Sequence, residues 1–250
     1  MSRIVEWLIV RNHIFPAIPT NEILDHYGFK PSGSTTAALV DLTHKISDML
    51  EDNKYVRCLL IDISRAFHSV GHLILVSKLK ALNIADNIMQ WVVQFSTDRN
   101  QFVKVSEMWS FTKFINRSIV QGSGIGPTLF IICIADLRPT GSTNYITKYA
   151  DDSSLLVPEN HDVGLYDELN NVLKNSEVNK IHINMAKTKE IVFHRPNARN
   201  VLLPSELPAI ERVLFAKLLG VWLQADMGMK THVVHICNLR TYLLKQLKRQ

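Results

Sequence analysis

The 250-residue sequence has three cysteines, no long apolar run, no internal repeat and no low-complexity tract. Cys58, Cys133 and Cys237 lie far apart and match neither a zinc nor a disulfide spacing, which argues against a disulfide-stapled domain and a cysteine-rich metal site. Cys58 and Cys133 fall in apolar runs, RCLLI and FIICI, where a buried free thiol is expected. This cysteine usage indicates a reducing compartment.

Membrane-spanning and secretion signals are also missing. The opening MSRIVEWLIVRNHIF has a short apolar stretch and no small-residue cleavage site after it. The apolar run LFIICIADL is broken by Asp136 and is far shorter than the roughly 18 residues that a membrane span needs. We expect a protein of the cytoplasm or nucleus that is not secreted and has no membrane partner.

The charge balance is mildly basic. Lysine and arginine number 28 against 23 acidic residues, and hydrophobic and charged contents of 46% and 20% are ordinary for a globular protein. A net charge of +5 fits a polyanionic partner such as nucleic acid, but many unrelated proteins are equally basic. Composition alone is therefore a weak guide to function.

Hydrophobic periodicity predicts long helices between a few apolar strands. This mixture indicates an α+β fold with the helices packed on one face of a sheet. Strands are expected over 55–63, in a hairpin spanning 144–158, within 181–195 and over 216–223, with a further hairpin region over 101–118. Helices are expected over 1–14, 35–53, 72–84, 85–98, 128–137, 162–181 and 229–250.

Two adjacent aspartates, Asp151 and Asp152, stand in the sequence KYADDSSLL between two β-prone runs. Neighbouring carboxylates repel each other, although a hairpin turn tolerates aspartate. The pair is either an acidic turn or a pair of metal ligands at a hairpin tip. A third carboxylate, Asp62, follows the apolar strand YVRCLLI. One aspartate at a strand end and a pair on a neighbouring hairpin are a minimal scaffold for the divalent cations of phosphoryl transfer.

Six segments, in this order, resemble the palm of a reverse transcriptase, most closely that of non-LTR (LINE-type) retrotransposons. They are HYGFKPSGSTTAAL, IDISRAFHSV, IVQGSGIGPTLF, YADD, NMAKTKEIVF and KLLGVWL. The resemblance implies an α+β polymerase palm, an antiparallel sheet backed by helices. It divides the chain into a partial fingers segment (1–55), the palm (56–228) and the start of a thumb (229–250).

The resemblance also implies roles for the carboxylates. Asp62 and Asp151 would bridge two Mg²⁺ ions, with Mn²⁺ as a substitute and with a backbone carbonyl from Ile63. Asp152 would support the metal site or the primer end. These ions would serve nucleotidyl transfer to a primer 3′-hydroxyl.

Further residues are assigned by the same resemblance. Phe67 would be the steric gate that rejects a ribose 2′-hydroxyl, and Gln121 with Gly122 would pack against the incoming nucleotide. Lys187, with Lys189 as the alternative, would protonate the pyrophosphate. Other matching positions are Gly124 and Gly126, approached closely by a ligand, and Leu219 and Gly220, in a hairpin that grips the primer.

The sequence departs from the family pattern at two positions. His68 stands where most relatives have an aspartate, and Gly33 where an arginine is common. His68 and His72 are four residues apart, but no third ligand joins them, so surface or packing roles are preferred. The glycine-rich GSGIG lacks the GK[ST] of a phosphate-binding loop.

The predicted function is that of an RNA-directed DNA polymerase domain acting on an RNA template, a DNA primer and deoxynucleoside triphosphates. We expect a fragment of a retroelement reading frame, with an intact carboxylate triad but incomplete fingers and thumb. The alternatives are a catalytically silent remnant that only binds nucleic acid or a partner, and an inert fragment that does not fold alone.

Overall fold

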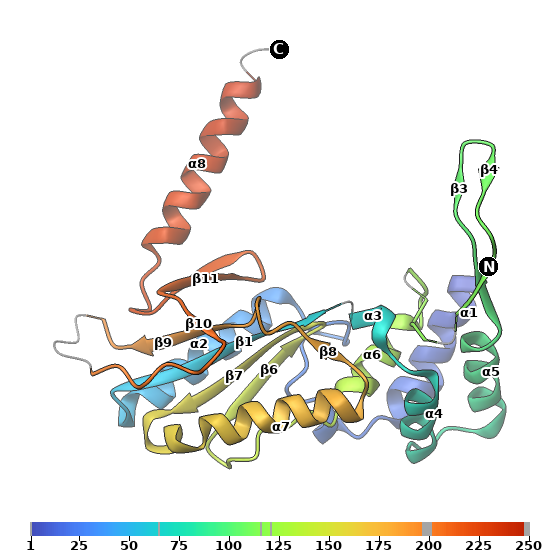
Figure 1. Cartoon of the computed structure of the whole chain (residues 1–250), viewed down its shortest axis with the longest axis horizontal. Coiled ribbons are helices and arrows are strands. Elements are labelled where there is room, and N and C mark those ends of the chain that lie inside the picture. Colours follow the sequence, from blue (N-terminus) through green and yellow to red (C-terminus); the bar gives the residue numbers. More distant parts are fainter. Residues whose placement is uncertain (1, 65, 116, 121, 197–201, 248–250) are drawn as a thin grey trace.

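The folded molecule has two halves, a central sheet with its covering helices and a group of helices beside it (Figure 1). The computed structural model describes residues 2–64, 66–115, 117–120, 122–196 and 202–247. In the sheet the strand order is β10-β9-β1-β7-β6, with β8 paired to the end of β1, and all neighbours are antiparallel except β9 and β10. The strands are β1 (Tyr55–Ser64), β6 (Tyr145–Tyr149), β7 (Asp152–Pro158), β8 (His182–Ile183), β9 (Lys189–His194) and β10 (Glu211–Arg212).

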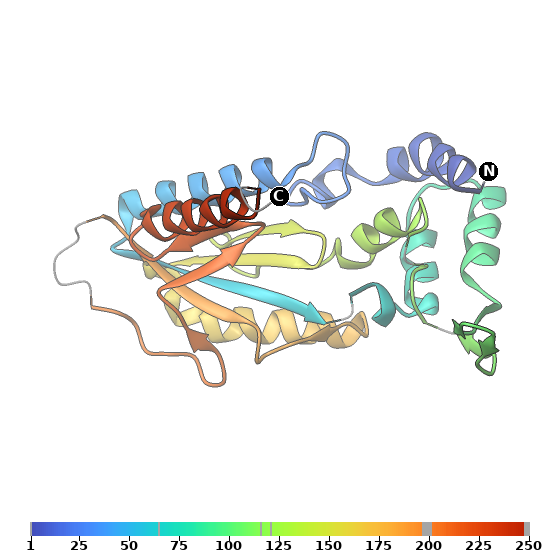
Figure 2. The same cartoon turned by 90° about the horizontal axis from the view of Figure 1, so that it is seen from above.

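The central strand β1 is buried on both faces of the sheet. Cys58 and Leu59 are adjacent and therefore point to opposite faces, yet both are fully buried. Helix α2 (Thr35–Asp52) covers one face and α7 (Leu165–Val178) the other, as Figure 2 shows. The expectation that helices pack on a single face is wrong. A strand with consecutive apolar residues, such as CLLI, needs cover on both sides.

Helix α2 forms where capping and periodicity agree. The Ser34 side chain accepts a hydrogen bond from the Ala37 amide at 3.0 Å and caps the first turn. Leu42, Ile46 and Leu50 follow at intervals of four and are buried against the sheet. This stripe fixes the face that α2 presents to β1.

The helical half is built around α6 (Gly126–Ile134). It is buried at every position except Pro127, as expected for a helix that is apolar all round. Cys133 is a buried free thiol, as is Cys58, which confirms the prediction for both. In the described residues, no helix is long and apolar enough to cross a bilayer. The other elements of this half are α1 (Ser2–Ile9), a π-helix (Val10–Ile14), 3₁₀ turns (Phe15–Ala17 and Thr20–Glu22), α3 (Ala66–Ser69), α4 (His72–Ala81) and α5 (Asp86–Ser96).

Two elements project from the same side of the molecule, at its opposite ends (Figure 1). One is helix α8 (Lys230–Leu247), which confirms the helix predicted there. The other is the predicted hairpin region, a ribbon whose strands pair in two steps. Its strands are β2 (Arg99–Gln101), β3 (Lys104–Val105), β4 (Met108–Trp109) and β5 (Lys113–Ile115).

The apolar pattern predicted one strand over 216–223, but the segment is a tight hairpin, as the resemblance implied for Leu219 and Gly220. Strands β11 (Phe215–Leu218) and β12 (Val221–Gln224) pair antiparallel, and Leu219 and Gly220 form the turn. Both turn residues have positive φ, 47° and 89°, as a type I′ turn requires. The apolar sequence conceals this turn because leucine rarely adopts such a backbone. A 3₁₀ segment (Glu159–Gly164) completes the described elements, and the division at residues 55 and 228 stays a prediction.

Candidate active site

The three aspartates meet at one end of the sheet. Asp62 lies near the end of β1, Asp152 begins β7, and Asp151 occupies the turn between β6 and β7. In the β1–β7 ladder Asp62 lies directly opposite Asp152. Opposite residues of an antiparallel pair put their side chains on one face with Cβ atoms about 5 Å apart. The fold therefore turns separated sequence positions into a cross-strand carboxylate pair with a third carboxylate beside it.

The turn that carries Asp151 has a constrained backbone. Ala150 is buried with φ 54°, a left-handed conformation that alanine seldom adopts. Gly28 packs against this turn so closely that an added Cβ would lie 2.5 Å from the Ala150 amide nitrogen. Only glycine leaves room for this approach. Sequence reasoning missed Gly28, although its place in the GFKPSGS loop was visible.

Lys148 holds the same turn in place from inside the protein. Its ammonium is fully buried, lies 2.9 Å from Asp25 Oδ2, and donates to the carbonyls of Leu137 (2.9 Å) and Ile134 (3.2 Å). Burial lowers the pKa of Lys148 to about 8, while the Asp25 carboxylate acts in the opposite direction. The backbone adds two bonds, from the Lys148 amide to Asp25 O and from the Tyr27 amide to Lys148 O. The catalytic hairpin is thus fixed to α6 and to the N-terminal segment.

The carboxylates repel one another in this arrangement. Burial, together with the negative charges of Asp151 and Asp62, raises the pKa of Asp152. In the described part of the chain, no group of three or more acidic, histidine or cysteine side chains is close enough to form a complete metal site. The pair and its neighbour nevertheless offer hard oxygen donors, and a divalent cation would relieve the repulsion that raises the pKa of Asp152.

Lys187 lies on a turn that is attached to the strand of Asp62. The Asn184 amide donates to Asp62 O at 2.9 Å, and the Asp62 amide donates to Thr188 Oγ1 at 3.4 Å. Lys187 is exposed on this turn, whereas Lys189 forms an ion pair with Glu211. The structure therefore leaves Lys187 the more available of the two predicted lysines.

Phe67 lies on the short helix α3, just beyond the carboxylates. Its ring stacks on Phe130 with centroids 5.1 Å apart and meets Phe29 edge-on at 6.1 Å. Phe67 is only partly buried, so one side of the ring remains accessible. His68 is exposed and its neighbour in sequence, which agrees with the predicted surface role.

The glycine-rich loop precedes helix α6. Gln121 lies outside the described residues, and Gly122 has φ 84°, which favours glycine. The Gly124 amide donates to Glu6 Oε2 at 2.6 Å, and a Cβ on Gly126 would lie 2.8 Å from Ile119 Cγ2. These two glycines are therefore approached by protein groups. The buried Glu6 was missed by sequence reasoning, although an acid within the apolar run VEWLIV is a signal.

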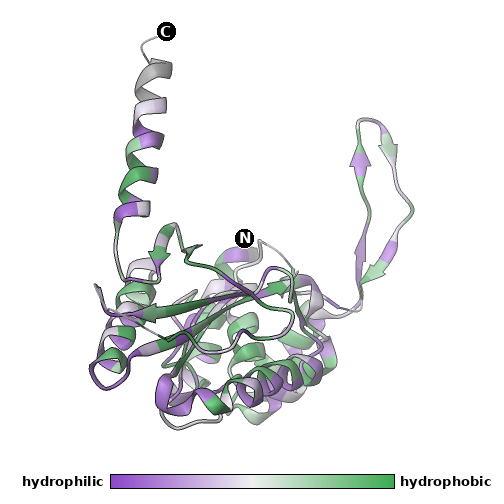
Figure 3. Cartoon of the chain, turned by 60° about the vertical axis from the view of Figure 1, so that its left-hand side comes forward, coloured by the Kyte–Doolittle hydropathy of each residue, from purple (hydrophilic) through white to green (hydrophobic). Residues whose placement is uncertain are grey.

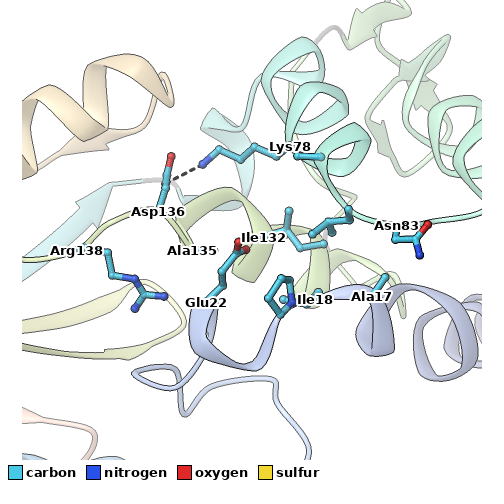
Figure 4. A pocket seen from close by; sticks show the side chains of 12 residues that line it. Ala17, Ile18, Glu22, Lys78, Asn83, Ile132, Ala135, Asp136 and Arg138 are labelled. Atoms are coloured by element: carbon cyan, nitrogen blue, oxygen red, sulfur yellow. Dashed lines mark ion pairs between the residues drawn. The ribbon is translucent and has the colours of Figure 1, made fainter.

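The β11–β12 turn also reaches this region. Leu219 lines a small cavity together with Tyr149 and Asp152. By contrast, a cavity of about 470 Å³ lies elsewhere, between the N-terminal segment and the ends of α4 and α6 (Figure 4). Its polar lining includes the Lys78–Asp136 ion pair at 2.8 Å, and none of the three site aspartates borders it. The hollow of Figure 4 is not the carboxylate site.

Comparisons with known proteins agree with this geometry. Residues 2–223 match the family described as "Reverse transcriptase (RNA-dependent DNA polymerase)". The chain is 27% identical, over 93% of its length, to the "Probable RNA-directed DNA polymerase from transposon BS" of Drosophila melanogaster, of which it covers 27%. It is 28% identical, over 61% of its length, to the "RNA-directed DNA polymerase from mobile element jockey" of Drosophila funebris, of which it covers 17%. The chain thus spans at most about a quarter of these relatives.

A solved structure shows the same fold. The telomerase of Candida albicans, in complex with a fragment of telomeric RNA, superimposes with a TM-score of 0.60 at 13% identity. The similarity covers 90% of this chain and 36% of that one. The predicted α+β polymerase palm is confirmed.

Proposed function

The chain belongs to the reverse transcriptase family and resembles the enzymes of non-LTR retrotransposons, and from this premise we propose that it is an RNA-directed DNA polymerase domain. The proposed reaction extends a DNA primer on an RNA template with deoxynucleoside triphosphates. The single observation that carries the proposal is the register of Asp62 against Asp152, with Asp151 in the adjoining turn.

Members of this family generally use divalent metal ions, and we propose two Mg²⁺ ions here, with Mn²⁺ as a substitute. Asp62, Asp151 and Asp152 would hold them, with a carbonyl from Ile63. When bound, such ions lower the pKa of a primer 3′-hydroxyl and stabilise negative charge on the α-phosphate. The support is the grouping of the three carboxylates: burial, and then the charges of Asp151 and Asp62, raise the pKa of Asp152, and a bound cation would offset both effects.

The chain's own groups have separate tasks in the proposal. Gly28 and Lys148 hold the turn of Asp151 in place, which keeps the carboxylates oriented without a conformational search. Lys187, exposed beside the strand of Asp62, gives a proton to the departing pyrophosphate. Leu219, which lines a small cavity with Asp152, and its neighbour Gly220 would contact the primer end.

The proposal is tested by primer extension on an RNA template with Mg²⁺. Asp151→Asn keeps the shape of the side chain but removes the charge of a metal ligand, so we expect extension to fall by at least about a hundredfold. Asp86→Asn, the same change at an exposed helix start, is the matched control and should retain activity. If the native chain melts cooperatively but extends no primer, the polymerase assignment is wrong for this chain.

The gate assignment makes a separate prediction. Phe67→Val replaces a ring that packs against Phe130 with a smaller side chain, which leaves room for a ribose 2′-hydroxyl. Ribonucleotides should therefore be incorporated about ten- to a hundredfold more readily relative to deoxynucleotides. Phe95→Val is the matched control, because Phe95 is also partly buried and stacked, on Trp91 at 5.5 Å. An unchanged ribonucleotide-to-deoxynucleotide ratio in Phe67→Val would remove the gate from the mechanism.

A further inference from the structure

The projecting ribbon of residues 99–115 exposes large apolar side chains far from any core. Phe102 and Trp109 are 51% and 59% exposed, and Phe111 and Phe114 are 94% and 83% exposed. Figure 3 shows the ribbon standing clear of the body, with hydrophobic and hydrophilic residues alternating along it. Exposed aromatic side chains gathered on one element indicate an interaction surface.

One face of the ribbon has a defined aromatic arrangement. Lys104 and Trp109 are cross-strand partners in the β3–β4 ladder, and the Lys104 ammonium lies 4.8 Å from the centroid of the Trp109 ring. The Phe102 ring lies on the same face, 4.9 Å from Trp109. We call Phe102, Lys104 and Trp109 the aromatic face. It combines flat π surfaces with a cation, the pair of features that receives stacked bases and their phosphates.

The charge around this face has one dominant sign. Between residues 99 and 117 there are four basic side chains and one acidic, Glu107. This imbalance complements a polyanion. The basic side chains are Arg99, Lys104, Lys113 and Arg117.

The base of the ribbon continues this character toward the candidate active site. A cavity of about 450 Å³ there is lined by two basic side chains, Arg117 and Lys180, and one acidic side chain, Asp98, with Phe114 and His72 among the others. The chain then runs beside α3, because the Ser118 amide bonds Val70 O at 2.9 Å and the Ile119 amide bonds Phe67 O at 2.7 Å. The polypeptide that leaves the ribbon is therefore bonded to the segment that carries Phe67.

We propose that the aromatic face and the cavity at the base of the ribbon, which Arg117 and Lys180 line, bind single-stranded nucleic acid. This inference rests on the proposed function, since the strand would be the template on its way to or from the carboxylates. Bases stack on Phe102 and Trp109, while Lys104 and Arg117 contact phosphates. A protein partner could also cover exposed aromatics, but the excess of basic side chains favours a polyanion.

The test is fluorescence anisotropy of labelled oligo(U) and oligo(dT), each of about 20 nucleotides, without divalent ions. The double variant Phe102→Ala, Trp109→Ala should weaken binding at least about tenfold, since base stacking on an aromatic is worth about 1–3 kcal/mol. Lys104→Gln should reduce the slope of log affinity against log salt concentration by about one, the value for one lost phosphate contact. If the double variant loses affinity for only one of the two oligonucleotides, the inference is still supported, and that oligonucleotide shows whether the ligand is RNA or DNA.

A control variant and the assay conditions separate this inference from others. Tyr166→Ala removes an aromatic that is 57% exposed on α7 and should bind like the native chain. The binding assay contains no divalent ions and does not depend on primer extension, so a failure of polymerisation and a failure of the ribbon are distinguishable. If the double variant melts like the native chain and binds both oligonucleotides as tightly, the inference is overturned. It is also overturned if the double variant changes the oligomeric state of the protein but leaves the affinity for both oligonucleotides unchanged.

Discussion

At the scale of single residues, His26 is the most unusual group beside the site. It is fully buried, and its Nδ1 and Nε2 find no hydrogen-bond partner in the described part of the chain. Burial first, and then the positive charges of Lys148, Arg138 and Lys30, lower its pKa from 6.5 to about 2. His26 is therefore neutral in the folded chain at all ordinary pH values.

This gives a pH dependence of stability with a definite sign. Between pH 6.5 and 2 the unfolded chain binds a proton on His26 that the folded chain does not, so acid favours unfolding. We expect the contribution of His26 to the free energy of unfolding to fall by about 2 kcal/mol between pH 7 and pH 5, measured by denaturant titration. His26→Phe should lose this contribution, while the exposed His44→Gln should keep it. Parallel pH profiles for native and His26→Phe proteins would contradict the assignment.

At the residue scale, the sequence pointed to the aspartates that the structure brings to one end of the sheet, but not to the residues that support them. Asp62, Asp151 and Asp152 were singled out because carboxylates near strand ends suit divalent cations, and the resemblance to a polymerase palm favoured that interpretation over an acidic turn. Their register was not predictable, since which aspartate opposes Asp62 depends on where the turn closes. The contact of Gly28 with Ala150 joins positions over a hundred residues apart, and neither carries a signal of the other.

At the scale of elements, the β11–β12 turn shows how backbone geometry can be hidden in an apolar sequence. Turns of this type usually contain asparagine followed by glycine, whereas here leucine takes the first position with φ 47°. A left-handed conformation costs a non-glycine residue about 1–2 kcal/mol. Gly220, at φ 89°, avoids that cost at the second position.

A matched pair of substitutions isolates this backbone effect. A Cβ added at Gly220 or at Gly164 would meet no atom within 4 Å, but Gly164 has an ordinary φ of −86°. Gly220→Ala should therefore lower the free energy of unfolding by about 1–2 kcal/mol, and Gly164→Ala, at the N-cap of α7, should lower it by less. Thermal or denaturant unfolding measures both, and equal effects would show that φ is not the cause.

The long elements were predictable because each carries its own pattern. The spacing of Leu42, Ile46 and Leu50 defines α2, and the continuous apolar run of β1 defines the central strand. Strands β8 and β10 have only two residues each and exist because a neighbouring strand offers hydrogen bonds. No local pattern distinguishes such segments from loops.

At the scale of the whole molecule, the N-terminal segment is built into both halves. Glu6 bonds the glycine loop before α6, and residues 25–28 bond and pack against the catalytic hairpin. Sequence reasoning assigned residues 1–55 to a partial fingers segment that leads into the palm. It had no means of showing that part of this segment completes the palm, because those contacts are made only after folding.

This N-terminal contact has a consequence for solubility. Strand β6 is the outermost strand at one edge of the sheet, and an edge strand presents free amide and carbonyl groups that recruit other chains. Residues 25–27 bond Lys148 on that outer side, in a parallel bridge with His26, and so close part of the edge. A chain that started after Gly28 would keep all three aspartates yet expose this edge. Such a chain should aggregate, and the N-terminal segment thus guards the sheet against self-association.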